Sequence, residues 1–128
     1  MKISGDKTVY IARGAVYSDM GNHKLAIDDF NKAIELDEKL SEGFFRRGLS
    51  MFHSKRYQEA IEDFNKAKEI ESERVSDNKL TEDEREWGIE DGLGQCQHAL
   101  GNFHKALMHY ETAIEHRPDN TDFMIHRA

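Results

Sequence analysis

The sequence predicts an all-α fold made of three copies of a helix–turn–helix unit. The main observation is a pattern of five positions that occurs three times with identical spacing. In order, the positions hold a small residue, a variable residue, an alanine, an aromatic residue and a second alanine. The pattern comprises Gly14, Tyr17, Ala26, Phe30 and Ala33; Gly48, Met51, Ala60, Phe64 and Ala67; and Gly94, Gln97, Ala106, Tyr110 and Ala113. The first two glycines are 34 residues apart and the next two 46, which is 34 plus 12. A second observation is composition, because one proline and nine glycines in 128 residues disfavour long coil.

Each part of the repeated unit has a physical reason. A glycine in the first helix lets two helix backbones approach closely. Gly21 and Gly101 are each followed by asparagine, as expected for a tight turn between antiparallel helices. Ala26, Phe30 and Ala33 fall on one face of the second helix, and the neighbouring isoleucines widen that face. A single helix pair cannot bury both of its apolar faces, so the copies are expected to stack.

These residues together resemble the tetratricopeptide repeat family, whose period is also 34 residues. The small residue in the first helix, the aromatics near the turn (Tyr57 and Phe103), the two alanines and the second-helix aromatic all match. The resemblance implies a right-handed superhelix within a single domain over 1–128. It places the repeats at about 7–40, 41–74 and 87–120.

The extra dozen residues, 75–86, form an acidic insertion before repeat three. Thr81 and Glu84 match a capping box, so the following helix is expected to start near Glu82. One interpretation is a solvated loop with a helix extension, since surface insertions are well tolerated. The alternative is an acidic docking surface for a basic partner, formed by Glu82, Asp83, Glu84, Glu86 and Trp87.

The last residues resemble the start of another repeat. The stretch 119–128 aligns with 5–14, with Ile125 over Ile11 and Arg127 over Arg13. We therefore expect residues 121–128 to begin a fourth repeat in a longer array. An isolated helix of about two turns is marginal, so it is expected to fray or to dock.

The family resemblance also implies a partner-binding groove lined by the first helices. On this sequence the groove residues are Ile11, Ala15, Phe45, Arg46, Leu49, Phe52, His53, Asp91, Gln95 and His98. A subgroup of the family binds acidic chaperone tails with basic and amide side chains on this face. The present sequence departs from that pattern, because Ile11, Ala15, Gly88 and Gly92 cannot supply the charge-assisted contacts to carboxylates.

The remaining face is apolar in its centre and suits an amphipathic helix or an extended apolar segment of a partner. Leu49 and Phe52 can equally be inter-repeat core, since large apolar residues at helical spacing are usually buried. Phe45 is expected to be more exposed than Phe44. On that expectation, Phe45→Glu should weaken partner binding and leave the fold intact.

No catalytic or metal-binding constellation is recognisable, so we expect no enzyme and no cofactor. The seven histidines lack the spacing of a zinc motif and are interpreted as surface residues. Cys96 is expected to be a packed small residue. The acidic pairs Asp28–Asp29 and Glu62–Asp63 are interpreted as solvated helix faces flanked by lysines.

The charge distribution excludes further classes of function. The formal net charge of −7 is located in 69–91, and the rest of the chain is balanced, so no basic face for nucleic acid exists. No apolar stretch reaches the length of a membrane span, no signal peptide is visible, and one cysteine permits no internal disulfide. We expect an intracellular, cytoplasmic protein that binds a protein or peptide partner. The alternative is an assembly subunit that self-associates, or docks into a larger complex, through its repeat edges or the acidic insertion.

Overall fold

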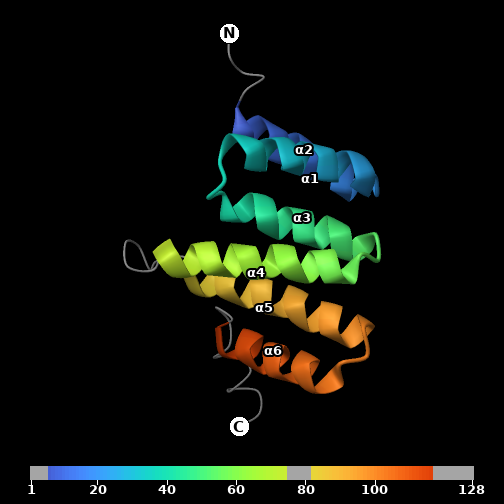
Figure 1. Cartoon of the computed structure of the whole chain (residues 1–128), viewed down its shortest axis with the longest axis vertical. Helices are drawn as coiled ribbons and strands as arrows, with labels where there is room; N and C mark the ends of the chain where they lie inside the picture. Colours follow the sequence, from blue (N-terminus) through green and yellow to red (C-terminus); the bar gives the residue numbers. More distant parts are fainter. Residues whose placement is uncertain (1–5, 75–81, 117–128) are drawn as a thin grey trace, which may run out of the picture.

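The computed structural model describes residues 6–74 and 82–116, which form six helices (Figure 1). They are α1 (Lys7–Asp19), α2 (His23–Leu36), α3 (Ser41–His53), α4 (Tyr57–Arg74), α5 (Glu82–Ala99) and α6 (Phe103–His116). Within these ranges there is no strand, and no helix is long and apolar enough to cross a membrane. The all-α prediction is confirmed.

The helices stack in chain order as a column of antiparallel hairpins, with α1 and α2 at one end and α6 at the other (Figure 1). Each helix packs mainly on the helices before and after it. The first helices also touch one another, since α3 contacts both α1 and α5. The helix starts at Lys7 and Ser41 lie 34 residues apart, which is the period of the sequence pattern.

The repeated glycines lie at the predicted close helix crossings. A methyl group on Gly14 would lie 2.6 Å from the Phe30 ring, and one on Gly94 would lie 2.8 Å from the Tyr110 ring. Phe64 is enclosed from two sides, because a methyl group on Gly48 or on Gly92 would lie 2.9 or 2.7 Å from its ring. The aromatic of each second helix thus fills the space that the missing side chains leave.

The turns inside the repeats require a left-handed residue at one equivalent position. Gly21 and Gly101 have φ of +85° and +87°, and Lys55 has φ of +67°. Glycine adopts this conformation without strain, whereas the Cβ of a lysine is crowded there. The prediction of tight turns at the two glycines is confirmed, and Lys55 is the strained member of the set.

The insertion is partly helical. Residues 82–86 belong to α5, in agreement with the capping pattern that predicted a start near Glu82. Residues 75–81 lie outside the described residues, as do residues 117–128 with the expected start of a fourth repeat.

The core follows the repeat aromatics. One buried cluster surrounds Phe30 between α1 and α2, and a larger one surrounds Phe64 and extends from α2 to α5. Cys96 is fully buried in the larger cluster, so its predicted role as a packed small residue is confirmed. Burial in apolar surroundings raises the pKa of its thiol to about 11, which keeps it protonated and unreactive near neutral pH.

Candidate partner-binding groove

The ten predicted groove residues all lie on the first helices α1, α3 and α5, but they differ in exposure. Ile11 is buried; Ala15, Phe45, Arg46, Leu49, Phe52, Asp91 and Gln95 are half-buried; His53 and His98 are exposed. The structure therefore leaves only part of the predicted set accessible to a partner.

Ile11 belongs to the core. It is 8% exposed and packs in the cluster around Phe30. Its side chain has little surface left for a partner, so its role in the groove is at most to support the floor.

Phe45 is less exposed than the sequence suggested. Phe44 is buried as expected, but the Phe45 ring lies 5.8 Å from the Phe64 ring and packs against the larger core cluster. It also faces α5, where a methyl group on Gly88 would lie 3.4 Å from its ring. A Phe45→Glu change would place a charge against the core, so it would test folding together with binding.

Leu49 and Phe52 are both core and surface. Each is half-buried and packs against the cluster around Phe64. The Phe52 ring also contacts Tyr57 in the next helix, with ring centroids 5.5 Å apart. The core interpretation is therefore confirmed for the packed side of each side chain, and the partner-binding interpretation stays a prediction.

Three of the predicted residues meet at a hollow between repeats two and three. This inter-repeat pocket has a volume of about 260 Å³ and is lined by Phe52, Gln95, His98, Ala99 and Tyr110. The lining comes from α3, α5 and α6, so the pocket exists only because the second and third repeats stack. Its two aromatic walls and its amide and imidazole groups suit an apolar side chain with a polar neighbour.

The pocket includes one residue that sequence reasoning assigned elsewhere. Tyr110 aligns with Phe30 and Phe64, which are fully buried, and was therefore expected in the core. It packs against Gly94 but remains half-buried, and one side of it reaches the pocket. The other two repeats have phenylalanine at this position. The tyrosine hydroxyl was therefore the sequence signal for partial exposure, because a buried tyrosine needs a hydrogen-bond partner or contact with solvent.

The polar groups of the predicted groove are largely paired with one another. Arg46 Nε donates to Glu42 Oε2 at 2.9 Å, and Gln95 Nε2 donates to Asp91 Oδ2 at 2.7 Å. Arg46 is the only arginine or lysine among the ten predicted residues, and its charge is already matched. This face therefore offers little positive charge to an acidic ligand.

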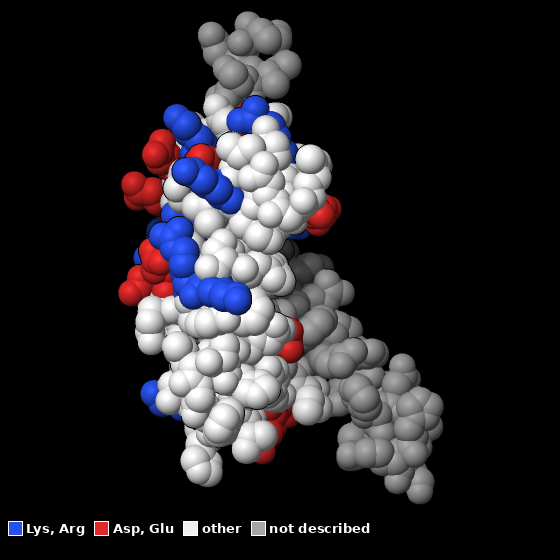
Figure 2. All heavy atoms as spheres, turned by 90° about the vertical axis from the view of Figure 1, so that its right-hand side faces the viewer, with Lys and Arg blue, Asp and Glu red and all other residues white. Residues whose placement is uncertain are grey.

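The edge that carries the turns inside the repeats differs in charge between its two ends. Figure 2 looks onto this edge and shows lysine and arginine side chains together with acidic ones in the upper half. The lower half, at the level of the third repeat, is mostly uncharged. The inter-repeat pocket thus lies toward the weakly charged end of the molecule.

Two acidic residues interpreted as solvated are instead buried in ion pairs, so that interpretation was wrong for them. Asp29 and Asp63 are 3% and 6% exposed, whereas their neighbours Asp28 and Glu62 are exposed. Arg13 holds both carboxylate oxygens of Asp29 at 2.8 and 2.7 Å.

The second repeat contains the same bidentate pair and extends it. Arg47 holds Asp63 at 2.9 and 2.7 Å, and its remaining Nη1 donates to Asn31 Oδ1 at 2.7 Å. Burial raises the pKa of Asp63, although the Arg47 guanidinium opposes that shift. The pair ties the two helices of one repeat together and reaches the repeat before it.

The third repeat replaces this pair by a different one. Glu90 in α5 is 2% exposed and meets Lys68 Nζ and His109 Nδ1, each at 2.7 Å. Burial alone would raise the pKa of Glu90, but the hydrogen bonds from Lys68 and His109 bring it below the ordinary value. His109 is thus an internal partner and not the surface residue expected from sequence.

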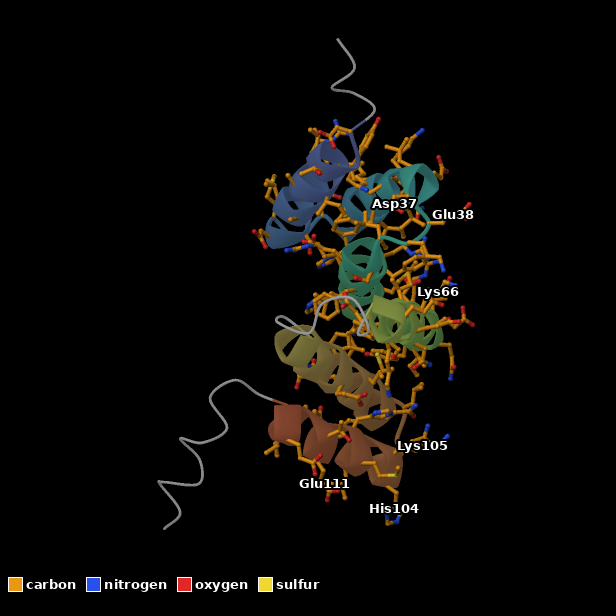
Figure 3. All side chains as sticks on the ribbon, turned by 90° about the vertical axis from the view of Figure 1, so that its left-hand side faces the viewer. Asp37, Glu38, Lys66, His104, Lys105 and Glu111 are labelled. Atoms are coloured by element: carbon orange, nitrogen blue, oxygen red, sulfur yellow. The ribbon has the colours of Figure 1, made fainter. Side chains whose placement is uncertain are left out.

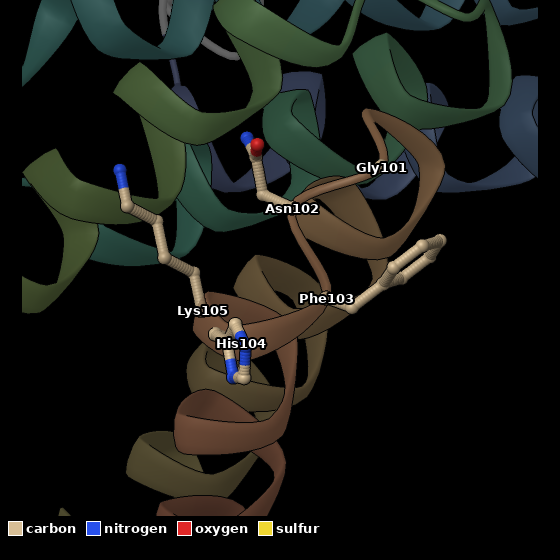
Figure 4. Close-up of a pocket in the computed structure, with 5 residues that line it drawn as sticks. All are labelled: Gly101, Asn102, Phe103, His104 and Lys105. Atoms are coloured by element: carbon tan, nitrogen blue, oxygen red, sulfur yellow. The ribbon is translucent and has the colours of Figure 1, made fainter.

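The other hollows do not bring functional groups together as closely. One of about 390 Å³ is lined by the consecutive residues 101–105, and Figure 4 shows the Phe103 ring directed away from Lys105. Another of about 460 Å³ lies between α2 and the α3–α4 turn, and Arg56 at its edge is paired with Glu59. Among the residues that the structure describes, no three potential metal ligands converge.

The predicted acidic docking surface remains a prediction. The backbone of Glu82, Asp83, Glu84, Glu86 and Trp87 lies in the first turns of α5. The side chains of these five residues are outside the described part of the structure.

Comparison with known proteins agrees with this class of fold, a stacked array of helical hairpins. Sequence models described as Tetratricopeptide repeat match residues 8–40, 41–74 and 92–120. The chain therefore belongs to the tetratricopeptide repeat family.

One curated relative and two solved structures illustrate this membership. The small glutamine-rich tetratricopeptide repeat-containing protein 2 of Mycosarcoma maydis is 37% identical over 60 residues, which are 46% of this chain and 17% of that protein. The chain thus spans only a small part of the relative's length. The first repeat domain of Spaghetti (RPAP3), bound to the HSP90 peptide SRMEEVD, is similar with a TM-score of 0.72 and 23% identity over 90% of this chain and 82% of the other. The first repeat domain of human RPAP3 gives a TM-score of 0.71 and 24% identity over 89% and 80%. At these identities the two structures bear on the fold alone.

Proposed function

We propose that the chain is a non-enzymatic binding module that holds a segment of a partner protein on the face of α1, α3 and α5. The inter-repeat pocket is the observation that carries the proposal. It is lined by Phe52, Gln95, His98, Ala99 and Tyr110, and it would take one apolar side chain of the partner. Membership of a family of interaction scaffolds supports the same class of function.

The chemistry of this face favours an apolar segment over an acidic tail. The structural neighbour named above is bound to an HSP90 peptide that contains acidic residues. Here Arg46 is occupied by Glu42, and Gly92 contacts Phe64 and supplies no donor. Asp91 adds negative charge on the same face. We therefore propose that the partner segment is apolar and near neutral, and that a chaperone-tail carboxylate clamp is not used.

The pocket-filling variant Ala99→Trp tests the proposal. Ala99 is an exposed residue at the end of α5 that lines the pocket, so a large side chain there can block the pocket without entering the core. The control is Leu25→Trp, at an exposed position of α2 outside the proposed face. Peptides would first be selected from a random library on the wild-type chain, and their affinities then measured by calorimetry.

The expected result is that the selected peptides share an apolar anchor. Their affinity should fall about tenfold or more in Ala99→Trp, because a buried apolar anchor contributes about 1.5–3 kcal/mol. The affinity should stay within about twofold in Leu25→Trp. The peptide SRMEEVD should bind more weakly than the selected peptides. Equal affinity in the two variants would refute the pocket. A loss of peptide affinity when Glu82, Asp83, Glu84 and Glu86 are neutralised would instead favour the acidic docking surface.

A further inference from the structure

The third repeat carries a polar pair where the other two repeats are apolar. Asp91 and Gln95 lie one turn apart on α5, and Gln95 Nε2 donates to Asp91 Oδ2 at 2.7 Å. Shifts of 46 and then 34 positions give the equivalent residues of the second and first repeats, which are Phe45 with Leu49 and Ile11 with Ala15. Those repeats form the same helix hairpin with apolar residues at these positions. The hairpin fold therefore does not require the polar pair.

The hydrogen bond decides which end of the Gln95 amide is available to a ligand. An ionised carboxylate only accepts hydrogen bonds, so Asp91 is met by the amide nitrogen and not by the amide oxygen. Asp91 lies toward the start of α5, whereas His98 and Ala99, which line the inter-repeat pocket, lie toward its end. The nitrogen is thus held on the side of Asp91, and Oε1 is the amide atom left for a group in the pocket.

The walls of the pocket are rings that other contacts hold in place. The Phe52 ring centroid lies 5.5 Å from that of Tyr57 and 5.4 Å from that of His53. The Tyr110 ring lies against the backbone of α5, since a methyl group on Gly94 would be 2.8 Å from it. Preformed walls of this kind lower the cost of ordering the site on binding.

The size and the walls of the pocket suit one flat side chain. Its volume of about 260 Å³ is below the roughly 300–1,000 Å³ of sites that hold drug-sized molecules. An aromatic side chain can stack on the Phe52 and Tyr110 rings or meet them edge-on, which adds to the gain from burial alone. An aromatic anchor is therefore favoured over an aliphatic one.

The charge around the pocket favours a hydrogen-bond donor. Burial, followed by the charge of the Asp91 carboxylate, raises the pKa of Tyr110 above its ordinary value, so this negative charge acts on the pocket wall. Lys66 and Lys105 are exposed and project on the side of the second helices, away from α1 (Figure 3). Negative charge beside the pocket attracts the positive edge of a ring or an N–H group.

We propose that the inter-repeat pocket selects a tryptophan of the partner segment, whose indole N–H donates to Gln95 Oε1, and that Asp91 is the positioning residue that holds Gln95 for this contact. The inference rests on the proposed function, since it names the side chain that enters the same pocket. The indole N–H only donates and the Gln95 oxygen only accepts, so the two groups satisfy each other. The indole rings supply the flat surface that the two walls favour.

Other anchors fit the site less well. A phenylalanine or leucine would leave Gln95 Oε1 without a donor, which is costly for an acceptor that the ligand buries. A tyrosine hydroxyl can donate, but its oxygen also accepts, and the Gln95 nitrogen is already held by Asp91. If the pair were only a contact on the helix surface, changing Asp91 would not alter which anchor is preferred.

The experiment compares two peptides that differ in a single hydrogen-bond donor. The probe is the tightest peptide selected from the random library on the wild-type chain, with its anchor position identified by alanine substitution. In the second peptide the anchor tryptophan is replaced by benzothienylalanine, which has sulfur in place of the indole N–H and nearly the same shape. Calorimetry gives the ratio of the two affinities for each protein variant, and circular dichroism checks that each variant is folded.

The ratio should depend on Gln95 and on Asp91. The wild-type chain should bind the tryptophan peptide about tenfold more tightly, because the analogue leaves Gln95 Oε1 unpaired. In Gln95→Leu the ratio should fall to within about twofold, since the acceptor is absent. In Asp91→Asn it should fall below about threefold, because a neutral amide both donates and accepts and lets the Gln95 nitrogen turn toward the pocket. The control Asp28→Asn, at an exposed position of α2, should keep the wild-type ratio.

The outcomes separate this inference from the proposed function. Selected peptides without tryptophan at the anchor, or with arginine there, would overturn the inference, whereas their loss of affinity in Ala99→Trp would still support the pocket. A wild-type ratio near one would overturn it as well. An unchanged ratio in Asp91→Asn would overturn the assigned role of Asp91. If Ala99→Trp left every affinity unchanged, the pocket and this inference would both be wrong.

Discussion

The enclosure of Phe64 between two glycines allows a quantitative test within one helix. Gly88 and Gly92 both lie in α5, one turn apart. A methyl group on Gly92 would lie 2.7, 2.9 and 3.0 Å from three atoms of the Phe64 ring. A methyl group on Gly88 would lie 3.4 Å from the nearest atom of Phe45, which is an ordinary contact. The same substitution to alanine therefore probes packing at one site and helix propensity at the other.

The two variants should change stability in opposite directions. Alanine gains about 0.8–1.0 kcal/mol over glycine inside a helix. At Gly92 this gain is opposed by overpacking of about 1–3 kcal/mol, since the fully buried Phe64 ring is also held by Gly48 and cannot move away. We expect Gly88→Ala to stabilise by up to about 1 kcal/mol, and Gly92→Ala to lie about 1–3 kcal/mol below it.

Urea denaturation followed by far-ultraviolet circular dichroism measures this difference. Equal m-values would show that the two variants unfold the same cooperative unit. If Gly92→Ala proved as stable as Gly88→Ala, the close crossing of α5 over Phe64 would be refuted.

Three further predictions concern the turn, the buried pair and the pH dependence. Lys55→Gly should raise the free energy of unfolding by about 1 kcal/mol in thermal melts, because it removes a lysine from the left-handed conformation, whereas Gly21→Ala should lower it by a similar amount. A lower stability of Lys55→Gly than of wild type would contradict the strain at Lys55. Asp63→Asn should destabilise by about 3 kcal/mol, since it leaves Arg47 without its bidentate partner, while the exposed neighbour Glu62→Gln should stay within about 0.5 kcal/mol; similar urea midpoints for the two would mean that Asp63 is solvated. The pKa of Glu90 is lowered from its ordinary value of 4.5, so ionised Glu90 stabilises the fold at pH values above 4.5, and this stability is lost as pH falls through the folded-state pKa. The urea midpoint should therefore drop more steeply below pH 4.5 in wild type than in Glu90→Gln. Parallel curves for the two proteins would argue against this linkage.

The elements were predictable because their signals are local and repeated. Three aligned glycines and three aligned aromatics fixed the helix crossings, and the capping pattern placed the start of α5 near Glu82. A residue's role in the core could be inferred wherever the pattern repeats with the same residue type. Gly14, Gly48 and Gly94 are of this kind.

The ion pairs were missed because each joins residues that the local helix pattern treats separately. Asp29 and Asp63 follow exposed acids and have lysines nearby, so each looks solvated when its own helix is considered alone. Their partners lie 16 residues earlier, on another helix. The recurrence of both arginine and aspartate after 34 residues was the signal that could have revealed the pairs.

The groove could be placed on its helices but not ranked by exposure. The side chains of Ile11 and Phe45 project from the expected helices, yet the packing of α2, α4 and α5 decides how much of each remains accessible. The pocket itself requires the third repeat to stack on the second. Its Tyr110 wall therefore could not be separated from the core by periodicity.

The most direct test of the binding proposal is a map of amide chemical-shift changes on titration of a selected peptide into the isotopically labelled chain. We predict that the largest changes fall on Phe52, Gln95, His98, Ala99 and Tyr110, and that they are lost in Ala99→Trp. Changes confined to residues 82–87, or spread over the second helices with the pocket unaffected, would contradict the proposed site.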